Sequence, residues 1–299
     1  MNDIMDINIY EVGPRDGLQN SDFKVSTINK INMIRELHYA GLKNIEVTSF
    51  VHPKRVPNLS DAEEVFQQTK ELGDMGVLIP NQKGFERAKE VGAKKLNVFF
   101  SPSNEFNNRN LGKNIDEIYS DLQTMLHDTN KEDVRAYISC AFGCPFEGLP
   151  AEHKLKDSIS KASEIADTVV LCDTIGEAYP TKILKTLELT HNIDANIAMH
   201  FHKKKIGGND IFNNVRASLE WGINSFDSSI NGLGGCPFIP NSGSNLSTNQ
   251  LVHWAENNGY ETGIKQKDLS YASQFVRDLE KGNRIIPEGF ITEAKPVIE

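Results

Sequence analysis

Short segments rich in Val, Ile and Phe alternate with longer amphipathic segments along most of this 299-residue chain, and this alternation most constrains its fold. The short segments are typical of buried strands, and the longer ones are typical of helices. The predicted strands span residues 7–12, 43–49, 75–80, 95–101, 134–142, 168–173, 196–202 and 225–230. The predicted helices span 27–40, 61–72, 83–91, 115–128, 151–166, 181–191, 210–221, 248–258 and 267–281.

Eight strand–helix units in about 260 residues match the size of a closed α/β barrel, the (β/α)8 or TIM barrel. The competing open, doubly wound sheet usually carries a phosphate-binding glycine turn after its first strand, and Gly13-Pro14-Arg15-Asp16-Gly17 is not that motif. No low-complexity segment or linker interrupts the chain. We therefore expect one catalytic domain over residues 1–299, with an extra C-terminal helix and a loosely attached tail after about residue 282.

The composition disfavours several classes of protein. A net charge of −9 argues against nucleic acid as a partner, although the run Lys203-Lys204-Lys205 could meet a phosphate or carboxylate of a small substrate. No apolar run approaches the ~18–20 residues of a membrane span, and the N-terminus lacks the features of a signal peptide. We expect no membrane contact, a cytoplasmic location and free thiols at the four scattered cysteines.

The first predicted strand delivers a charged pair to its C-terminal end. Gly13-Pro14 stops the strand, because proline has no N–H to donate, and Arg15 and Asp16 follow at once. In a barrel the C-terminal ends of all strands meet at one rim, where such folds carry their catalytic residues. The polar residues predicted at this rim include Arg15, Asp16, Glu46, Ser49, Asp173, His200 and His202. For Arg15 and Asp16 alone, an ordinary surface ion pair is the alternative.

His200 and His202 are the most informative pair. Because they lie two residues apart on a strand, their side chains point to the same side and both can reach one metal ion. A lone histidine is more often a hydrogen-bonded core residue, but Asp16 is available across the barrel. Imidazole and carboxylate ligands suit Mn²⁺, Mg²⁺, Co²⁺ or Zn²⁺. The sequence therefore predicts a divalent-cation site.

A glycine-rich loop, Gly232-Leu233-Gly234-Gly235-Cys236, follows the eighth strand. Its glycines allow the backbone to approach a ligand closely, and its thiol is a candidate for proton transfer. The alternative is an ordinary connection with a silent cysteine. Farther along, Asn245 could cap the next helix or offer an oxygen to the cation, and Ser247 could be the cap instead.

Five motifs together resemble one enzyme family. They are G-P-R-D-G-L-Q-N (13–20), I-E-V-T-S-F-V (45–51), C-D-T-I-G (172–176), H-F-H (200–202) and D-S-S-I-N-G-L-G-G-C-P-F (227–238). In these motifs the chain is similar to the 3-hydroxy-3-methylglutaryl-CoA (HMG-CoA) lyases, within the metal-dependent lyase and Claisen-condensing barrels. The resemblance runs from about Ile9 to Gly282. It implies a TIM-barrel lyase that cleaves HMG-CoA to acetoacetate and acetyl-CoA.

The resemblance also implies roles for individual residues. The implied ligands of a divalent cation, Mg²⁺ or Mn²⁺, are Asp16, His200, His202 and Asn245. The implied catalytic residues are Arg15, which stabilises the enolate, Cys236, an acid/base on a mobile loop, and Glu46 and Asp173, which support the metal ligands. Gln19, Ser49 and Gly235 are expected to contact an acyl-CoA substrate, and a homodimer is expected. The base that takes the 3-hydroxyl proton is either His200 or Asp16.

Three departures from the family pattern bear on the acyl group. The loop that begins with Lys203-Lys204-Lys205 is longer than usual, Asn249 stands where the family tends to carry glutamate, and Cys172 replaces a usual glycine. Two alternatives to HMG-CoA cleavage therefore stay open. One is a lyase for another 3-hydroxyacyl-CoA, such as citramalyl-CoA, and the other is a catalytically silent barrel used for binding or regulation.

Overall fold

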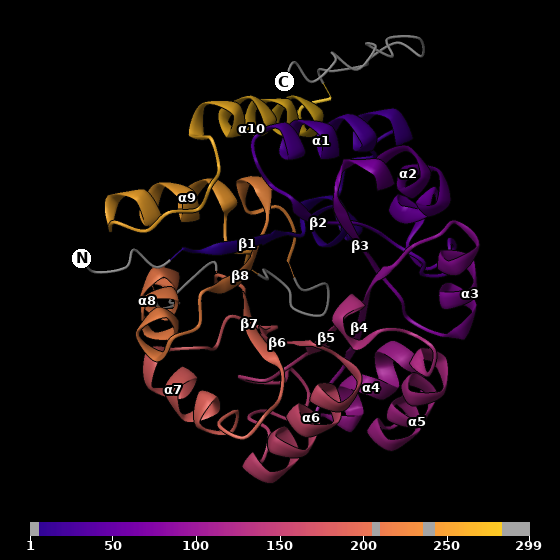
Figure 1. The fold of residues 1–299 in the computed structure, drawn as a ribbon, viewed down its shortest axis with the longest axis vertical. Helices are drawn as coiled ribbons and strands as arrows, with labels where there is room; N and C mark the ends of the chain where they lie inside the picture. The colour runs from indigo at the N-terminus through magenta and orange to yellow at the C-terminus, as the bar shows by residue number, and fades with distance from the viewer. Residues whose placement is uncertain (1–5, 205–209, 236–242, 283–299) are drawn as a thin grey trace.

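The computed structural model of the protein describes residues 6–204, 210–235 and 243–282. Across these residues eight parallel strands close into a barrel in chain order, and β8 pairs with β1 (Figure 1). The strands are β1 (Asn8–Glu11), β2 (Asn44–Ser49), β3 (Asp74–Leu78), β4 (Lys95–Phe100), β5 (Val134–Ile138), β6 (Thr168–Asp173), β7 (Asn196–Phe201) and β8 (Ser225–Ser228). The closed ring confirms the predicted TIM barrel and excludes the open sheet.

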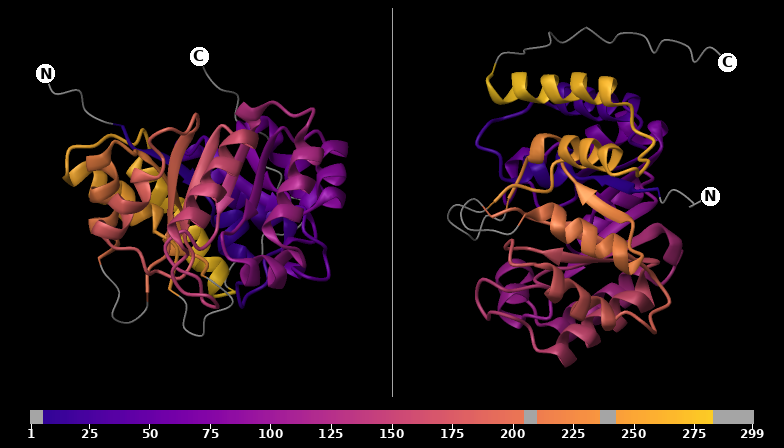
Figure 2. Two further views of the ribbon diagram at one scale, coloured as in Figure 1. Left: turned by 90° about the horizontal axis from the view of Figure 1, so that it is seen from below. Right: turned by 90° about the vertical axis from the view of Figure 1, so that its left-hand side faces the viewer.

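Helices form a layer around the strands, as Figures 1 and 2 show. They are α1 (Thr27–Tyr39), α2 (Ala62–Thr69), α3 (Gln82–Glu90), α4 (Asn104–Leu111), α5 (Ile115–Leu126), α6 (Glu152–Ile165), α7 (Pro180–Glu188), α8 (Ile211–Trp221), α9 (Thr248–Asn257) and α10 (Gln266–Glu280). The extra helix α10 packs against α1, whereas the expected loose tail lies outside the described residues. In the described part of the chain no helix has the length and apolar character needed to cross a membrane.

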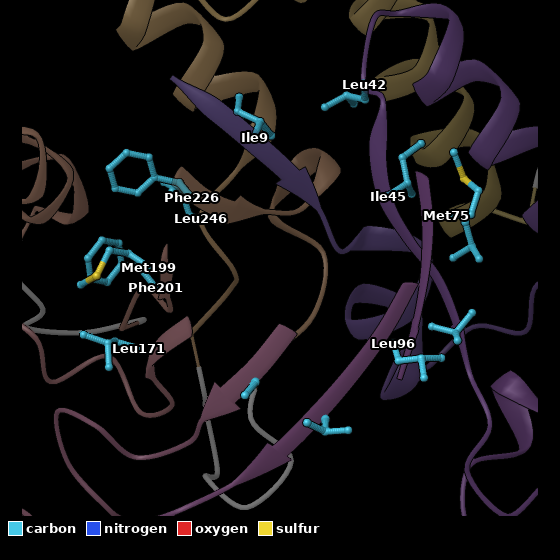
Figure 3. Packing of buried hydrophobic residues seen from close by; sticks show 14 of the residues in the cluster. Ile9, Leu42, Ile45, Met75, Leu96, Leu171, Met199, Phe201, Phe226 and Leu246 are labelled. Carbon is cyan, nitrogen blue, oxygen red and sulfur yellow. The ribbon is translucent and has the colours of Figure 1, made fainter. Parts of the chain in front are cut away.

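The main hydrophobic core lies between the strands and this helical layer. Alternate residues of each strand point outward, and Phe201 on β7 and Phe226 on β8 are fully buried there, as Figure 3 shows. The intervening residues point into the barrel and form a smaller cluster of Tyr137, Val170, Cys172 and Ala198, together with buried polar groups. The barrel interior is therefore free to carry charged side chains while the outer core supplies the apolar burial.

One helix was missed from the sequence, and one strand was predicted to be too long. The helix α4 was not predicted, because its sequence is rich in asparagine, which has low helix propensity. It begins where the Ser103 hydroxyl accepts the N–H of Phe106 and ends at Gly112, which has a left-handed φ of 72°. Strand β5 stops at Ile138 rather than continuing to residue 142, and Cys140 takes a φ of 61°, which no strand residue adopts.

Candidate metal centre and active site

A single turn of π-helix, Gly13–Gly17, follows β1 and presents Arg15 and Asp16 to the barrel mouth. The backbone oxygen of Val12 faces three N–H groups of this turn, at 3.2 Å from Arg15, 2.7 Å from Asp16 and 3.2 Å from Gly17. Pro14, near the start of the turn, has no N–H to leave unsatisfied. The sequence predicted a break at this point, and the structure shows that the break is an ordered turn.

Arg15 is buried at the mouth and bridges two carboxylates. Its Nε donates to Glu46 Oε2 at 2.5 Å, and its Nη1 donates to Asp16 Oδ1 at 2.6 Å. Burial alone would raise the pKa of Asp16, but the positive charge of Arg15, helped by the nearby imidazoles and the hydrogen bond from Asn245, outweighs it and lowers this pKa to about 2. Asp16 is therefore an ionised carboxylate over the whole physiological pH range.

His200 and His202 face the same point as Asp16. Ligand atoms of these three residues lie within 4.8 Å of one another, and the two imidazole rings have centroids 4.9 Å apart. The Nδ1 of His202 lies 3.1 Å from the backbone oxygen of Asp173, and the Nδ1 of His200 lies 3.2 Å from Asp227 Oδ2. Because both partners are acceptors, each Nδ1 carries the hydrogen, which leaves each Nε2 lone pair available to a metal ion.

Asn245 completes this group through the return of the chain after β8. Its backbone forms an antiparallel bridge with His202, and its Nδ2 donates to Asp16 Oδ2 at 2.8 Å and to the Leu233 oxygen at 2.7 Å. Its Oδ1 is buried and has no hydrogen-bond partner among the described residues. Ser247 caps α9 instead, by accepting the N–H of Gln250, so the Asn245 oxygen is left for a ligand.

These four residues fit a hard divalent cation. A carboxylate, two neutral imidazole nitrogens and an amide oxygen without a partner form a mixed oxygen and nitrogen donor set that contains no thiolate. Gly234 explains why the glycine loop is needed beside this group. It has a φ of 94°, and a Cβ there would lie 2.7 Å from Asn245 Nδ2, so a larger residue would displace the amide.

The candidate metal-binding group of Asp16, His200, His202 and Asn245 lies at a cavity of about 950 Å³, which the first three of these residues line. Three residues expected at the substrate, Gln19, Ser49 and Gly235, line this cavity, whereas Glu46 lies behind Arg15 and does not. The Asp173 carboxylate also faces away from it, because its two oxygens accept the backbone N–H groups that follow β6. Burial raises the Asp173 pKa to about 6. The other predicted catalytic residue, Cys236, lies outside the described residues.

Buried polar residues that the sequence did not single out hold these groups in place. Asn97 on β4 donates to Glu46 Oε1 at 2.7 Å, and so fixes the carboxylate that binds Arg15. Asp227 on β8 contacts His200 as described above, and Arg135 on β5 contacts Asp227. The sequence does carry one signal for these residues, which is a charged or amide side chain within an otherwise apolar strand. Such a side chain must point into the barrel and find a partner there.

The sequence matches known lyases over most of its length. The family model described as HMGL-like matches residues 6–276. The hydroxymethylglutaryl-CoA lyase YngG of Bacillus subtilis (strain 168) is 39% identical over 279 residues, which cover 91% of this chain and 92% of that protein. The mitochondrial hydroxymethylglutaryl-CoA lyase of Homo sapiens is 37% identical over 275 residues, which cover 90% of this chain and 84% of that protein.

Solved structures agree with these matches. The HMG-CoA lyase from Brucella melitensis superimposes with a TM-score of 0.85 at 33% identity, covering 93% of this chain and 99% of that chain. An HMG-CoA lyase from Acinetobacter baumannii, in complex with coenzyme A and 3-methylmalate, has a TM-score of 0.85 at 31% identity and covers 98% of both chains. The family model and the relatives each span more than two thirds of the chain. On these matches, the chain belongs to the HMGL-like family of lyases.

Proposed function

We propose that this protein is a divalent-metal-dependent carbon–carbon lyase that cleaves HMG-CoA into acetoacetate and acetyl-CoA. The observation that carries the proposal is the convergence of Asp16, His200 and His202, within 4.8 Å of one another, beside the unpartnered oxygen of Asn245. This convergence occurs in a chain that is 39% identical to a hydroxymethylglutaryl-CoA lyase.

We further propose that Asp16, His200, His202 and Asn245 hold Mg²⁺ or Mn²⁺. A cation bound there supplies Lewis acidity toward the 3-hydroxyl group of the substrate. The Nδ1 hydrogen of His200 is held by Asp227 and its Nε2 would bind the cation, so neither ring nitrogen is free to take the 3-hydroxyl proton. The carboxylate of Asp16 is the other candidate base, and its pKa of about 2 makes it a weak proton acceptor.

We propose that Arg15 stabilises the negative charge that develops when the bond between C2 and C3 breaks. Its Nε and Nη1 are held by Glu46 and Asp16, so its Nη2 remains to donate to the oxygen of the thioester enolate. Asn97 fixes Glu46 from behind, which holds the guanidinium before the charge appears. A prepositioned charge of this kind contributes roughly 3–4 kcal/mol to transition-state stabilisation. We propose that Cys236 then protonates the enolate carbon to give acetyl-CoA.

The cavity suits a large anionic thioester. The fixed cations that line it are Arg15, Lys54, Arg55 and Arg109, whereas Asp16 is the one acidic side chain of its described lining, in a chain of net charge −9. We propose that Lys54 and Arg55, which are exposed at its edge, meet phosphates of the CoA group. The homodimer and the cytoplasmic location expected from the sequence stay predictions.

The two alternatives are not favoured. The relatives named above are HMG-CoA lyases, which argues against a citramalyl-CoA lyase. The extended lysine loop that prompted this alternative has Lys204 paired with Glu177, and Lys205 lies outside the described residues. A silent barrel would have no need to keep the metal ligands and Arg15 together.

The proposal is tested by offering the purified protein a panel of 3-hydroxyacyl-CoA thioesters with Mg²⁺ or Mn²⁺ and measuring acetyl-CoA. We expect HMG-CoA to be the preferred substrate, and a chelator to abolish its cleavage until metal is restored. Arg15→Met should lower kcat by about 100-fold or more. The control Arg87→Met removes an arginine that pairs with Glu63 outside the barrel, and should retain activity. Preference for another thioester, or near-full activity of Arg15→Met, would contradict the proposal.

A further inference from the structure

An ion pair crosses the interior of the barrel below the metal-binding group. Arg135 on β5 donates from Nη2 to Asp227 Oδ1 on β8 at 2.7 Å, and the Asp227 side chain is 0% exposed. Strands β5 and β8 are not neighbours in the ring (Figure 1), so this contact spans the barrel rather than following its wall. The Arg135 guanidinium also lies over the ring of Tyr10, 4.0 Å from its centroid.

The other oxygen of Asp227 contacts a proposed metal ligand. Asp227 Oδ2 lies 3.2 Å from the Nδ1 of His200, its neighbour in the register of β7 and β8. A carboxylate in this position accepts the Nδ1 hydrogen, which fixes both the tautomer and the tilt of the imidazole ring. The Nδ1 of His202 is held by a backbone oxygen instead, so within the part of the chain that the structure describes only His200 of the pair has its Nδ1 held by another side chain.

The stability of the barrel does not explain this ion pair. A buried ion pair is often no more stabilising than apolar side chains of similar volume, because both charges lose their hydration. Other inward positions of the same barrel, Val170 and Ala198, are apolar and fully buried. An apolar pair could therefore fill the space of Arg135 and Asp227, but it could not accept the Nδ1 hydrogen of His200.

We propose that Asp227 and Arg135 are positioning residues for the metal centre: Asp227 orients His200, and Arg135 anchors Asp227 from the opposite wall. The proposal rests on the metal site of the proposed function, but not on the reaction catalysed there. Asp227 acts directly on the ligand, whereas Arg135 acts one step farther away. Loss of either should weaken metal binding without removing a ligand, and the effect of Arg135 should be the smaller.

The test measures Mn²⁺ binding to the substrate-free protein by calorimetry and by the electron paramagnetic resonance of free Mn²⁺. We expect Asp227→Asn to weaken Mn²⁺ binding by about 10- to 100-fold, which is the usual loss when the partner of a metal-bound histidine is changed. Arg135→Met should weaken it less, and Arg135→Lys should recover part of the loss. In ¹⁵N-labelled protein, the Nδ1–H tautomer of His200 should be lost or mixed in Asp227→Asn while that of His202 is unchanged.

A matched control separates positioning from general stability. Asp61→Asn breaks the Lys30–Asp61 ion pair (2.6 Å) between α1 and the start of α2, which touches no histidine, and should leave Mn²⁺ affinity within about twofold of wild type. Equal losses in Asp61→Asn and Asp227→Asn, or a wild-type tautomer and affinity in Asp227→Asn, would overturn the proposal. So would a wild-type protein that binds no Mn²⁺. If the variants weaken Mn²⁺ binding as expected but the wild-type protein cleaves no HMG-CoA, the positioning roles are supported and the lyase function is refuted.

Discussion

The buried carboxylate of Glu11 should make the stability of this protein depend on pH. Glu11 ends β1 and is 0% exposed. Its Oε1 accepts the N–H groups of Gly13 at 2.8 Å and Ile230 at 2.9 Å, and its Oε2 accepts the Thr248 hydroxyl at 2.6 Å. Burial raises the Glu11 pKa from 4.5 to about 7, although these hydrogen bonds act to lower it.

The size and sign of the effect follow from the two pKa values. A rise from 4.5 to about 7 corresponds to about 3 kcal/mol at 1.36 kcal/mol for each pH unit. The native state holds the proton more tightly, so this contribution is complete below pH 4.5 and is lost as pH rises through 7. About 2 kcal/mol of it should disappear between pH 5.5 and pH 8.5.

Glu11→Gln isolates this contribution, because the amide cannot ionise. Its Oε1 can still accept from Gly13 and Ile230, and Thr248 can turn its hydroxyl toward Ser228, 2.7 Å away. We would measure the free energy of unfolding in urea, without metal, at both pH values for the two proteins. Wild type should lose about 2 kcal/mol more than the variant. Parallel pH dependence would refute the assignment of a raised pKa to Glu11.

Three further predictions concern substrate, metal and core. Lys54→Gln/Arg55→Gln should lower kcat/KM for HMG-CoA by about 2- to 30-fold, at about 0.4–2 kcal/mol for two exposed ion pairs, and leave the corresponding pantetheine thioester unaffected; equal losses for both thioesters would contradict phosphate binding. Asn245→Ala should weaken Mn²⁺ binding measured by calorimetry, because it removes the proposed oxygen ligand, and an unchanged affinity would exclude Asn245 from the site. Phe226→Ala should lower the free energy of unfolding in urea by about 3–5 kcal/mol, since this ring is fully buried in the outer core.

The fold could be predicted because its signal is local. Each strand carries apolar residues at the positions that face the helices, such as Met199 and Phe201 on β7, and each helix follows at a regular interval. The helix that was missed is the one with the weakest local signal. The asparagine-rich helix α4 depends on Ser103 and Gly112 at its ends rather than on helix-forming residues.

The candidate site could be predicted only where its residues lie close together in sequence or recur in a family motif. His200 and His202 share a strand, and Arg15 and Asp16 share a turn. Arg135 and Asp227 are 92 residues apart, and they meet only because the barrel closes with a particular register. No local pattern encodes that closure, so these inward-facing charges could not be paired from the sequence.

The described segments that end at Gly235 and begin again at Gly243 are both fastened to the barrel. In the first segment the N–H of Ile230 donates to Glu11 Oε1. In the second segment the backbone of Asn245 forms an antiparallel bridge with His202. Insertions between the two glycines that keep Cys236 should therefore leave Asn245 where it is. The position of the proposed oxygen ligand is therefore fixed by the barrel itself, and it should tolerate evolutionary change in the length of the neighbouring sequence.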